Sequence, residues 1–132
     1  MNGLHLIADL HDCRCAPGLL LDAPGLQAYC AELCRRHGLT VVGQLFHAFH
    51  DATGLPAGVT GTVVLAESHL AVHTWPEISA VTLDVYVCNF SGDNSQQAAA
   101  LFDEVIAHFQ PGHCERKAVR RGQLGVSENQ AA

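Results

Sequence analysis

The chain has 132 residues, which is enough for one domain with a modest hydrophobic core. Hydrophobic residues make up 48% of the sequence and charged residues only 15%, a composition that excludes an intrinsically disordered protein. The net charge of −6 argues against nucleic acid or an anionic membrane as the main partner, and it would suit a cationic ligand.

The first part of the chain predicts one strand and one helix. Residues 3–10 form an apolar run that is typical of a strand. Residues 11–21 contain two cysteines, a proline and a glycine, so we expect a loop there. An amphipathic helix is expected over residues 23–37, because Pro24 fits its first turn and Gly38 fits its end.

The middle of the chain predicts three strands. Residues 40–49 and 58–66 are rich in β-branched and aromatic side chains, and residues 50–57 connect them. The next strand, over residues 69–75, ends at Pro76. Alternation in the first of these strands predicts two faces, one with Val42, Phe46 and Ala48 and the other with His47 and Phe49.

The C-terminal part predicts a strand, a helix and a last strand. Residues 80–89 alternate, which should turn Val81, Leu83, Val85 and Val87 to the core and Thr82, Asp84, Tyr86 and Cys88 to the opposite side. A turn over residues 91–94 should cap a helix whose apolar residues repeat at helical spacing up to Phe109. Residues 113–121 are expected as a strand, and the tail from Gly122 is expected to fray.

This order of elements predicts an α+β fold. We expect a two-layer α/β sandwich, in which an antiparallel sheet carries two helices packed on one face, and we expect a single domain over residues 1–132. The face without helices would carry His69, His73 and Cys88. Function is therefore expected on that face or at a partner's surface.

Residues 67–77 concentrate the reactive side chains of the sequence. The run reads Glu-Ser-His-Leu-Ala-Val-His-Thr-Trp-Pro-Glu and follows an apolar strand. It places the hydroxyl of Ser68 beside the carbonyl of Glu67, with imidazoles nearby to move protons. These are the groups that a chain needs to break its own backbone between Glu67 and Ser68. The same run also fits an ordinary pair of strands with polar residues at the turn.

Residues 67–77 closely resemble the processing and active-site segment of the pyruvoyl-dependent S-adenosylmethionine decarboxylases, short prokaryotic type, and the resemblance covers residues 3–121. It implies self-cleavage into a beta chain, 1–67, and an alpha chain, 68–132, in which Ser68 becomes a covalent pyruvoyl cofactor. The implied reaction decarboxylates S-adenosylmethionine through a Schiff base and yields the aminopropyl donor for spermidine, a polyamine.

The resemblance also implies roles for single residues. His73 and Thr60 would assist cleavage, although Thr60 stands where the family has a serine, and Cys88 would donate a proton to the product carbon. Phe49 matches the aromatic residue that stacks on adenine, and Glu77 matches the acid that binds the ribose hydroxyls.

A homodimer, or a dimer of cleaved pairs, is implied as well. The family's active site lies between two subunits, so Phe49 and Glu77 would serve the partner's pyruvoyl group. The connection over residues 50–57 is several residues longer than in the family and follows Phe49 directly, so it could reshape the substrate pocket.

Several alternatives remain open at this point. The same pyruvoyl scaffold could decarboxylate arginine or ornithine, or the chain could stay uncleaved and act as a regulatory partner. A structural zinc site is a further alternative, with Cys13, Cys15, Cys30 and Cys34 as ligands. We expect no metal, because His69 and His73 would lie about 13 Å apart on a strand. With no leader and no membrane-spanning run, a cytoplasmic location and free thiols are expected.

Overall fold

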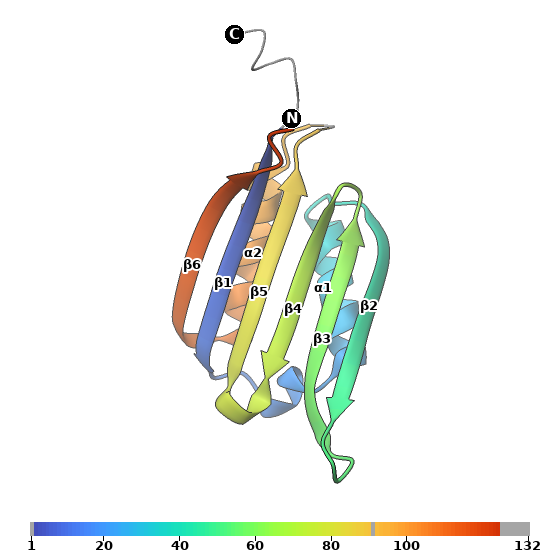
Figure 1. Ribbon diagram of the computed structural model, residues 1–132, viewed down its shortest axis with the longest axis vertical. Coiled ribbons are helices and arrows are strands. Elements are labelled where there is room, and N and C mark those ends of the chain that lie inside the picture. Colours follow the sequence, from blue (N-terminus) through green and yellow to red (C-terminus); the bar gives the residue numbers. More distant parts are fainter. Residues whose placement is uncertain (1, 91, 125–132) are drawn as a thin grey trace, which may run out of the picture.

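The computed structural model describes residues 2–90 and 92–124 and contains a six-stranded antiparallel sheet with two helices on one face (Figure 1). The strand order across the sheet is β2-β3-β4-β5-β1-β6. The strands are β1 (Gly3–Cys13), β2 (Val41–His50), β3 (Pro56–Leu65), β4 (Ser68–Trp75), β5 (Ala80–Cys88) and β6 (Pro111–Arg121). The helices are α1 (Ala23–Arg36) and α2 (Ser95–Phe109), with short 3-10 turns η1 (Pro17–Leu20) and η2 (Pro76–Ile78). The expected two-layer α+β architecture is confirmed.

Each helix begins and ends where its sequence predicts. The carboxylate of Asp22 accepts a hydrogen bond from the backbone N–H of Gly25 at 2.9 Å and so caps α1 at its first turn, which also contains a proline. Helix α2 buries its entire apolar stripe against the sheet. The stripe consists of Ala98, Leu101, Phe102, Val105, Ile106 and Phe109. Each Å² of apolar surface that is buried stabilises the fold by about 25 cal/mol, so this layer is the main source of stability.

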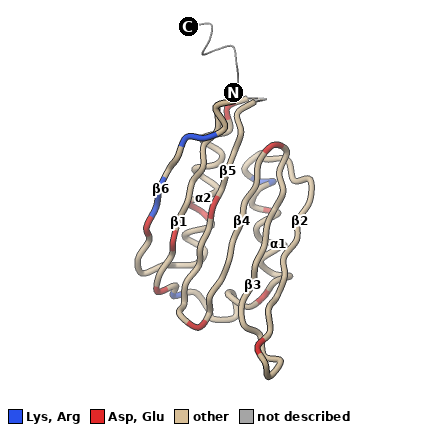
Figure 2. The backbone as a smooth tube through the Cα atoms, viewed as in Figure 1, with Lys and Arg blue, Asp and Glu red and all other residues tan. Residues whose placement is uncertain are grey.

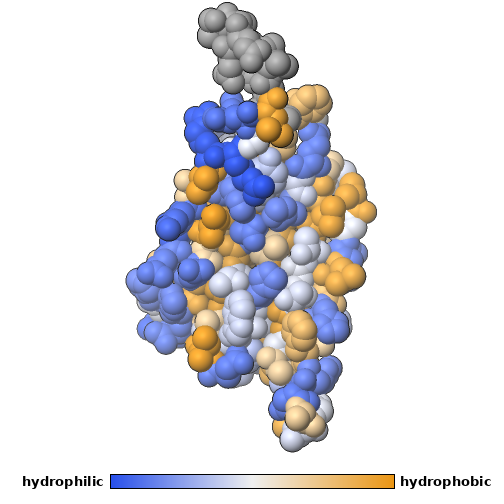
Figure 3. All heavy atoms as spheres, in the orientation of Figure 1, coloured by the Kyte–Doolittle hydropathy of each residue, from blue (hydrophilic) through white to orange (hydrophobic). Residues whose placement is uncertain are grey.

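The two faces of the sheet differ in chemistry. Alternate residues of β5 and β4 are fully buried beneath the helices, among them Val85, Leu83 and Leu70. The opposite face, which we call the open face, points toward the viewer in Figures 1 and 3 and mixes hydrophobic with polar side chains. Four of the seven Lys and Arg residues lie in β6, whereas β2, β3 and β4 contain no Lys, Arg, Asp or Glu (Figure 2).

Two local predictions were wrong. Strand β1 continues to Cys13 instead of ending at residue 10, because it pairs with β6 as far as Pro111. Val42 does not share a face with Phe46 and is 62% exposed. An irregularity in the β2–β3 ladder between Val41 and Gly43 shifts the alternation by one residue, so that Val41 packs against the core in its place.

The other residues of β2 lie on the faces that their alternation predicts. Phe46 covers Gly61 on the helix side, where any Cβ would meet the phenyl ring at 2.1 Å. His47 and Phe49 share the open face, with ring centroids 4.7 Å apart. The expected fraying of the tail concerns mainly residues 125–132, which lie outside the described residues.

Candidate active site

The Glu67–Ser68 peptide bond lies in a tight turn between β3 and β4. Leu65 and Ser68 are paired in the ladder, so only Ala66 and Glu67 form the connection. The N–H of Ala66 donates to the carbonyl of Thr40 at 2.9 Å, which ties the turn to the start of β2. Glu67 has a φ of 66°, in the left-handed region that non-glycine residues occupy at a cost of about 1–3 kcal/mol. The residue before Ser68 is therefore strained.

Ser68 and Cys88 are neighbours although twenty residues separate them. The β4–β5 hairpin brings them together, and the backbone N–H of Cys88 donates to Ser68 Oγ at 3.2 Å. Cys88 is 9% exposed and lies outside the hydrophobic cluster beneath the helices. The Ser68 hydroxyl, which accepts one backbone hydrogen bond, and the buried Cys88 thiol thus lie at the same end of the sheet.

A cavity of about 220 Å³ adjoins this turn on the side of the helices. Its lining comes from the segment after α1, the end of β3, the turn itself and the residue before α2. The lining residues are Gly38, Leu39, Thr40, Leu65, Ala66, Glu67, Ser68 and Asn94. The cavity lies on one side of the Glu67–Ser68 peptide bond, but it is smaller than the 300–1,000 Å³ typical of ligand sites.

Thr60 and His73 form a second reactive pair. They are directly opposite in the β3–β4 ladder, and Thr60 Oγ1 lies 2.6 Å from His73 Nδ1. Both side chains are partly buried on the open face, and the ring of Trp75 lies 6.1 Å from that of His73. Thr60 therefore places its hydroxyl against the imidazole as a serine would, with its extra methyl as the only addition.

Phe49 and Glu77 lie at the same end of the sheet as this pair. Phe49 is 48% exposed near the end of β2, where it pairs with Gly58. Glu77 is in η2, directly after β4. A cavity of about 400 Å³ lies beside Glu77 and is lined by Leu21, Asp51, Pro56, Ala57, Pro76 and Glu77. The connection after β2 thus contributes to the surroundings of Glu77.

One copy of the chain does not bring the Ser68–Cys88 pair and the Thr60–His73 pair together. Ser68 begins β4 and His73 lies five residues further along it, so they are about 16 Å apart at 3.3 Å per residue. Trp75, which ends β4 next to Glu77, is about 23 Å from Ser68 by the same measure. Alternation also turns Ser68 and His73 to opposite faces of a regular strand. The extended strand therefore carries two separate groups, one at Ser68 and one at His73.

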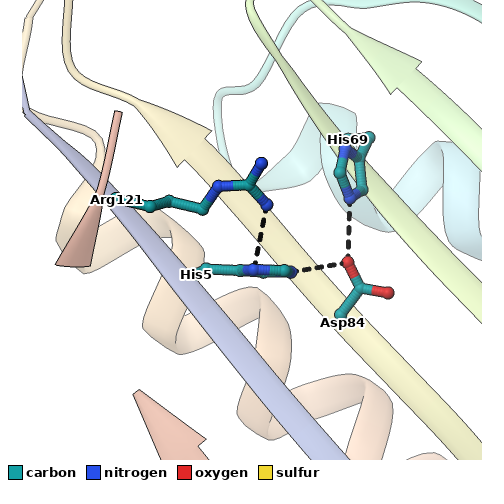
Figure 4. A network of polar contacts seen from close by, with 4 residues as sticks. All are labelled: His5, His69, Asp84 and Arg121. Carbon is teal, nitrogen blue, oxygen red and sulfur yellow. Dashed lines mark hydrogen bonds and ion pairs between the residues drawn. The ribbon is translucent and has the colours of Figure 1, made fainter. Parts of the chain in front are cut away.

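A polar network on the open face includes two residues, His5 and Arg121, that the sequence patterns did not single out (Figure 4). Asp84 Oδ2 lies 2.9 Å from His5 Nε2 and 2.8 Å from His69 Nε2. Arg121 Nη1 lies 3.1 Å from His5 Nδ1. His5 sits alone in an apolar run, and its partners are 79 and 116 residues away. Alternation of β1 could have placed it on the open face, but only the strand order could have paired it.

The zinc alternative with four cysteines finds no support in the structure. Within residues 2–90 and 92–124, the group with metal-binding geometry is His5, His69 and Asp84, and it contains no cysteine. Burial raises the pKa of Cys30 to about 12 and that of Cys34 to about 11. Cys30 and Cys34 lie on the buried side of α1 and are part of the hydrophobic core.

Comparison with known proteins decides the family. A family model described as S-adenosylmethionine decarboxylase matches residues 4–122. The chain belongs to the S-adenosylmethionine decarboxylase family. The S-adenosylmethionine decarboxylase proenzyme of Hydrogenobaculum sp. (strain Y04AAS1) is 35% identical over 126 residues, which cover 96% of this chain and 86% of that protein. The proenzyme of Acidithiobacillus ferrooxidans (strain ATCC 53993 / BNL-5-31) is 36% identical over 124 residues, 94% of this chain and 85% of its own length.

A solved structure of this decarboxylase family has the same fold. The crystal structure of the adenosylmethionine decarboxylase from Aquifex aeolicus VF5 superposes with a TM-score of 0.77 at 28% identity. The superposed region covers 93% of this chain and 92% of the Aquifex aeolicus chain. The described helices of this family member include none long and apolar enough to cross a membrane.

Proposed function

We propose that this chain is a self-cleaving proenzyme that becomes a pyruvoyl-dependent S-adenosylmethionine decarboxylase, a carboxy-lyase that makes the aminopropyl donor for spermidine. Decarboxylation of S-adenosylmethionine is the activity of the family to which the chain belongs. The observation that carries the cleavage step is the strained Glu67, followed at once by a serine whose hydroxyl is held by a backbone donor.

Cleavage would begin with attack of Ser68 Oγ on the carbonyl carbon of Glu67. The amide nitrogen leaves, and an ester replaces the peptide bond. Removal of the α-proton of residue 68 then expels the Glu67 carboxylate, which keeps the serine oxygen. The remaining dehydroalanine takes up water and releases ammonia, which leaves a pyruvoyl group on His69. The reaction needs a base and a held peptide bond but no oxidant.

The pyruvoyl group supplies an electrophilic carbonyl that takes up the α-amine of the substrate and accepts the electrons released with CO₂. Cys88 fits this group, because its backbone already contacts residue 68 and its thiol is sheltered from bulk water. We assign Cys88 the delivery of the proton to the product carbon. Thr60 and His73 are assigned to the cleavage step, since hydroxyl and imidazole are in hydrogen-bond contact.

The separation of Ser68 and His73 along β4 supports a site that is shared between two copies of the chain. Ser68 and His73 lie about 16 Å apart along β4, and the cavity at Ser68 is too small for S-adenosylmethionine. A twofold axis across the open face would bring the Ser68 end of one copy to the His73 end of the other. Exposed hydrophobic side chains on the uncharged strands β2, β3 and β4 favour such an interface: Leu45, Phe49, Val64 and Trp75.

In this homodimer, the side chains that bind the substrate come from the partner's copy. Phe49 would stack on adenine and Glu77 would accept hydrogen bonds from the ribose hydroxyls, both toward the pyruvoyl group of the other chain. The connection over residues 51–55 lies beside them and is stiffened by Asp51, whose carboxylate accepts from the N–H groups of Thr53 and Leu55. It would form one wall of the substrate pocket.

The experiment is an intact-mass measurement together with a CO₂-release assay. Fresh protein should contain chains of 67 and 65 residues, since 132 minus 67 leaves 65, and the second should carry a blocked N-terminus. S-adenosylmethionine should be decarboxylated at least tenfold more efficiently than arginine or ornithine, which have neither an adenine nor a diol. A single intact mass would refute the cleavage. Release of CO₂ from arginine or ornithine alone would refute the substrate and leave the pyruvoyl chemistry standing.

A further inference from the structure

We propose that Arg121, His5 and Asp84 are positioning residues that hold His69, and with it the new end of β4, after the chain has cleaved. The inference rests on the cleavage proposed above. It concerns the network in Figure 4, which the cleavage and substrate roles leave without a task.

Cleavage removes two of the restraints on residue 68. The peptide bond to Glu67 is lost, and the tight turn no longer connects β3 to β4. The serine oxygen leaves with the Glu67 carboxylate, so the hydrogen bond from the N–H of Cys88 to Ser68 Oγ is lost as well. A first residue that is not tied down frays. The amide between the pyruvoyl group and His69 must nevertheless keep one orientation, because its carbonyl belongs to the electron-accepting group.

His69 is the first residue after the break with a side-chain anchor. Its Nε2–H donates to Asp84 Oδ2 at 2.8 Å, since an ionised carboxylate only accepts. Arg121 can only donate, so His5 Nδ1 must accept at 3.1 Å, and the proton of the neutral His5 ring is then on Nε2. This Nε2–H donates to the same Asp84 oxygen at 2.9 Å.

The four side chains cross four neighbouring strands. His69 is on β4, Asp84 on β5, His5 on β1 and Arg121 on β6, which is the order of these strands in the sheet. The ring of Tyr86 lies next to both histidines, with centroids 5.8 Å from His5 and 5.9 Å from His69, and the Arg121 guanidinium lies over it at 4.4 Å. Such a connected, partly buried network fixes rotamers better than one isolated pair.

A metal site is the competing interpretation of the same residues. His5, His69 and Asp84 place three possible ligand atoms within 4.8 Å of one another. A metal on His5 Nε2 would require a proton on His5 Nδ1 and an acceptor opposite it. The structure places the guanidinium of Arg121 there instead, which adds a positive charge next to the supposed cation. The geometry therefore favours a hydrogen-bonded network over a metal.

The test compares Asp84→Asn in two backgrounds, the cleaved enzyme and the uncleavable Ser68→Ala chain. Amide hydrogen exchange at His69 and Leu70 is measured by NMR in each. In the cleaved enzyme, Asp84→Asn should raise these exchange rates at least tenfold, and Asp84→Leu, which lacks any acceptor, should raise them further. In the Ser68→Ala background the same substitutions should change them less than threefold, because the turn still holds the strand.

Glu104→Gln is the matched control. Its carboxylate also joins a histidine and an arginine, accepting from His37 Nε2 at 2.9 Å and Arg36 Nη2 at 3.0 Å, but it links the two helices and makes no hydrogen bond to β4. It should leave exchange at His69 unchanged in both backgrounds. His5→Phe, which keeps the ring contact with Tyr86, is the second variant and should reproduce the effect of Asp84→Asn in part.

Kinetics give a further readout. Asp84→Asn should still cleave fully by mass, and should lower kcat about tenfold while leaving KM for S-adenosylmethionine within twofold. Equal exchange rates for Asp84→Asn and wild type in the cleaved enzyme would overturn this inference while leaving the proposed function intact. Stoichiometric zinc uptake that depends on Asp84 would overturn it in favour of a metal site. A wild-type chain that never cleaves would overturn both proposals.

Discussion

The two ends of strand β4 are built in different ways. At the Ser68 end, a strained turn and a backbone donor hold a hydroxyl, so the geometry depends on the main chain. At the other end, a regular ladder carries a side-chain pair, Thr60 and His73, in direct contact. A bond that breaks needs strain and a nucleophile, whereas proton transfer needs a rigid platform for an acid or base. Because one strand carries both at a distance, we propose that the reaction joins two copies of the chain.

The largest effect is expected from Ser68→Ala. Alanine has no oxygen to attack the Glu67 carbonyl, so cleavage and decarboxylation should both be lost completely. Intact mass should show one chain of 132 residues, and the CO₂ assay should show no signal above background. Ser68→Cys serves as the control, since a thiol can still attack. Two chains from the Ser68→Ala protein would remove this serine from the mechanism.

The next effect tests whether the two ends act across copies. His73→Ala alone should slow cleavage about 10²–10⁴-fold, as loss of a general acid or base does. Co-expression of Ser68→Ala with His73→Ala should restore cleavage in mixed dimers, where the Ser68 of one copy meets the His73 of the other. Only the His73→Ala chain should be cut, which mass spectrometry distinguishes. If neither chain is cut in the mixture, the two ends act within one copy.

Cys88→Ala is expected to separate the two reactions at the Ser68 end. Its backbone N–H remains, so Ser68 keeps its donor and cleavage should proceed at close to the wild-type rate. Decarboxylation should fall about 10²-fold, because the product carbon loses its proton donor. Cys88→Ser should retain part of the activity. Unchanged turnover in Cys88→Ala would assign the proton delivery to another group.

The smallest effects should come from substitution of the two residues proposed to bind the substrate. Phe49→Ala removes a stacking surface worth about 1–3 kcal/mol, which corresponds to about 5–150-fold in kcat/KM. Glu77→Gln should cost about tenfold in the same quantity. Neither should change the rate of cleavage at Ser68, which a time course of the mass spectrum checks. Faster or slower cleavage in both variants would instead show that this end of the sheet is disturbed as a whole.

Sequence patterns predicted the fold because the alternation of β5 and the stripe of α2 leave one arrangement of layers. They misplaced Val42, since an irregularity in a ladder leaves no mark in the alternation. The residues of the Glu67–Glu77 run were evident from their chemistry, and the strand expected over residues 69–75 already implied that they are spread along its length. The partners of His5 could not be found from sequence, because they come from two other strands, β5 and β6.

The strand order has a consequence for the cleaved protein. The piece before the break contains β1, β2 and β3, and the piece after it contains β4, β5 and β6. In the sheet β1 lies between β5 and β6, so the two pieces interleave instead of lying side by side. Separating them means breaking three ladders, β3–β4, β5–β1 and β1–β6. If the chain cleaves as proposed, its folding changes from a unimolecular to a bimolecular reaction. Once denatured, the mature enzyme should regain its structure at a rate that rises with concentration, whereas the uncleaved chain should refold independently of it.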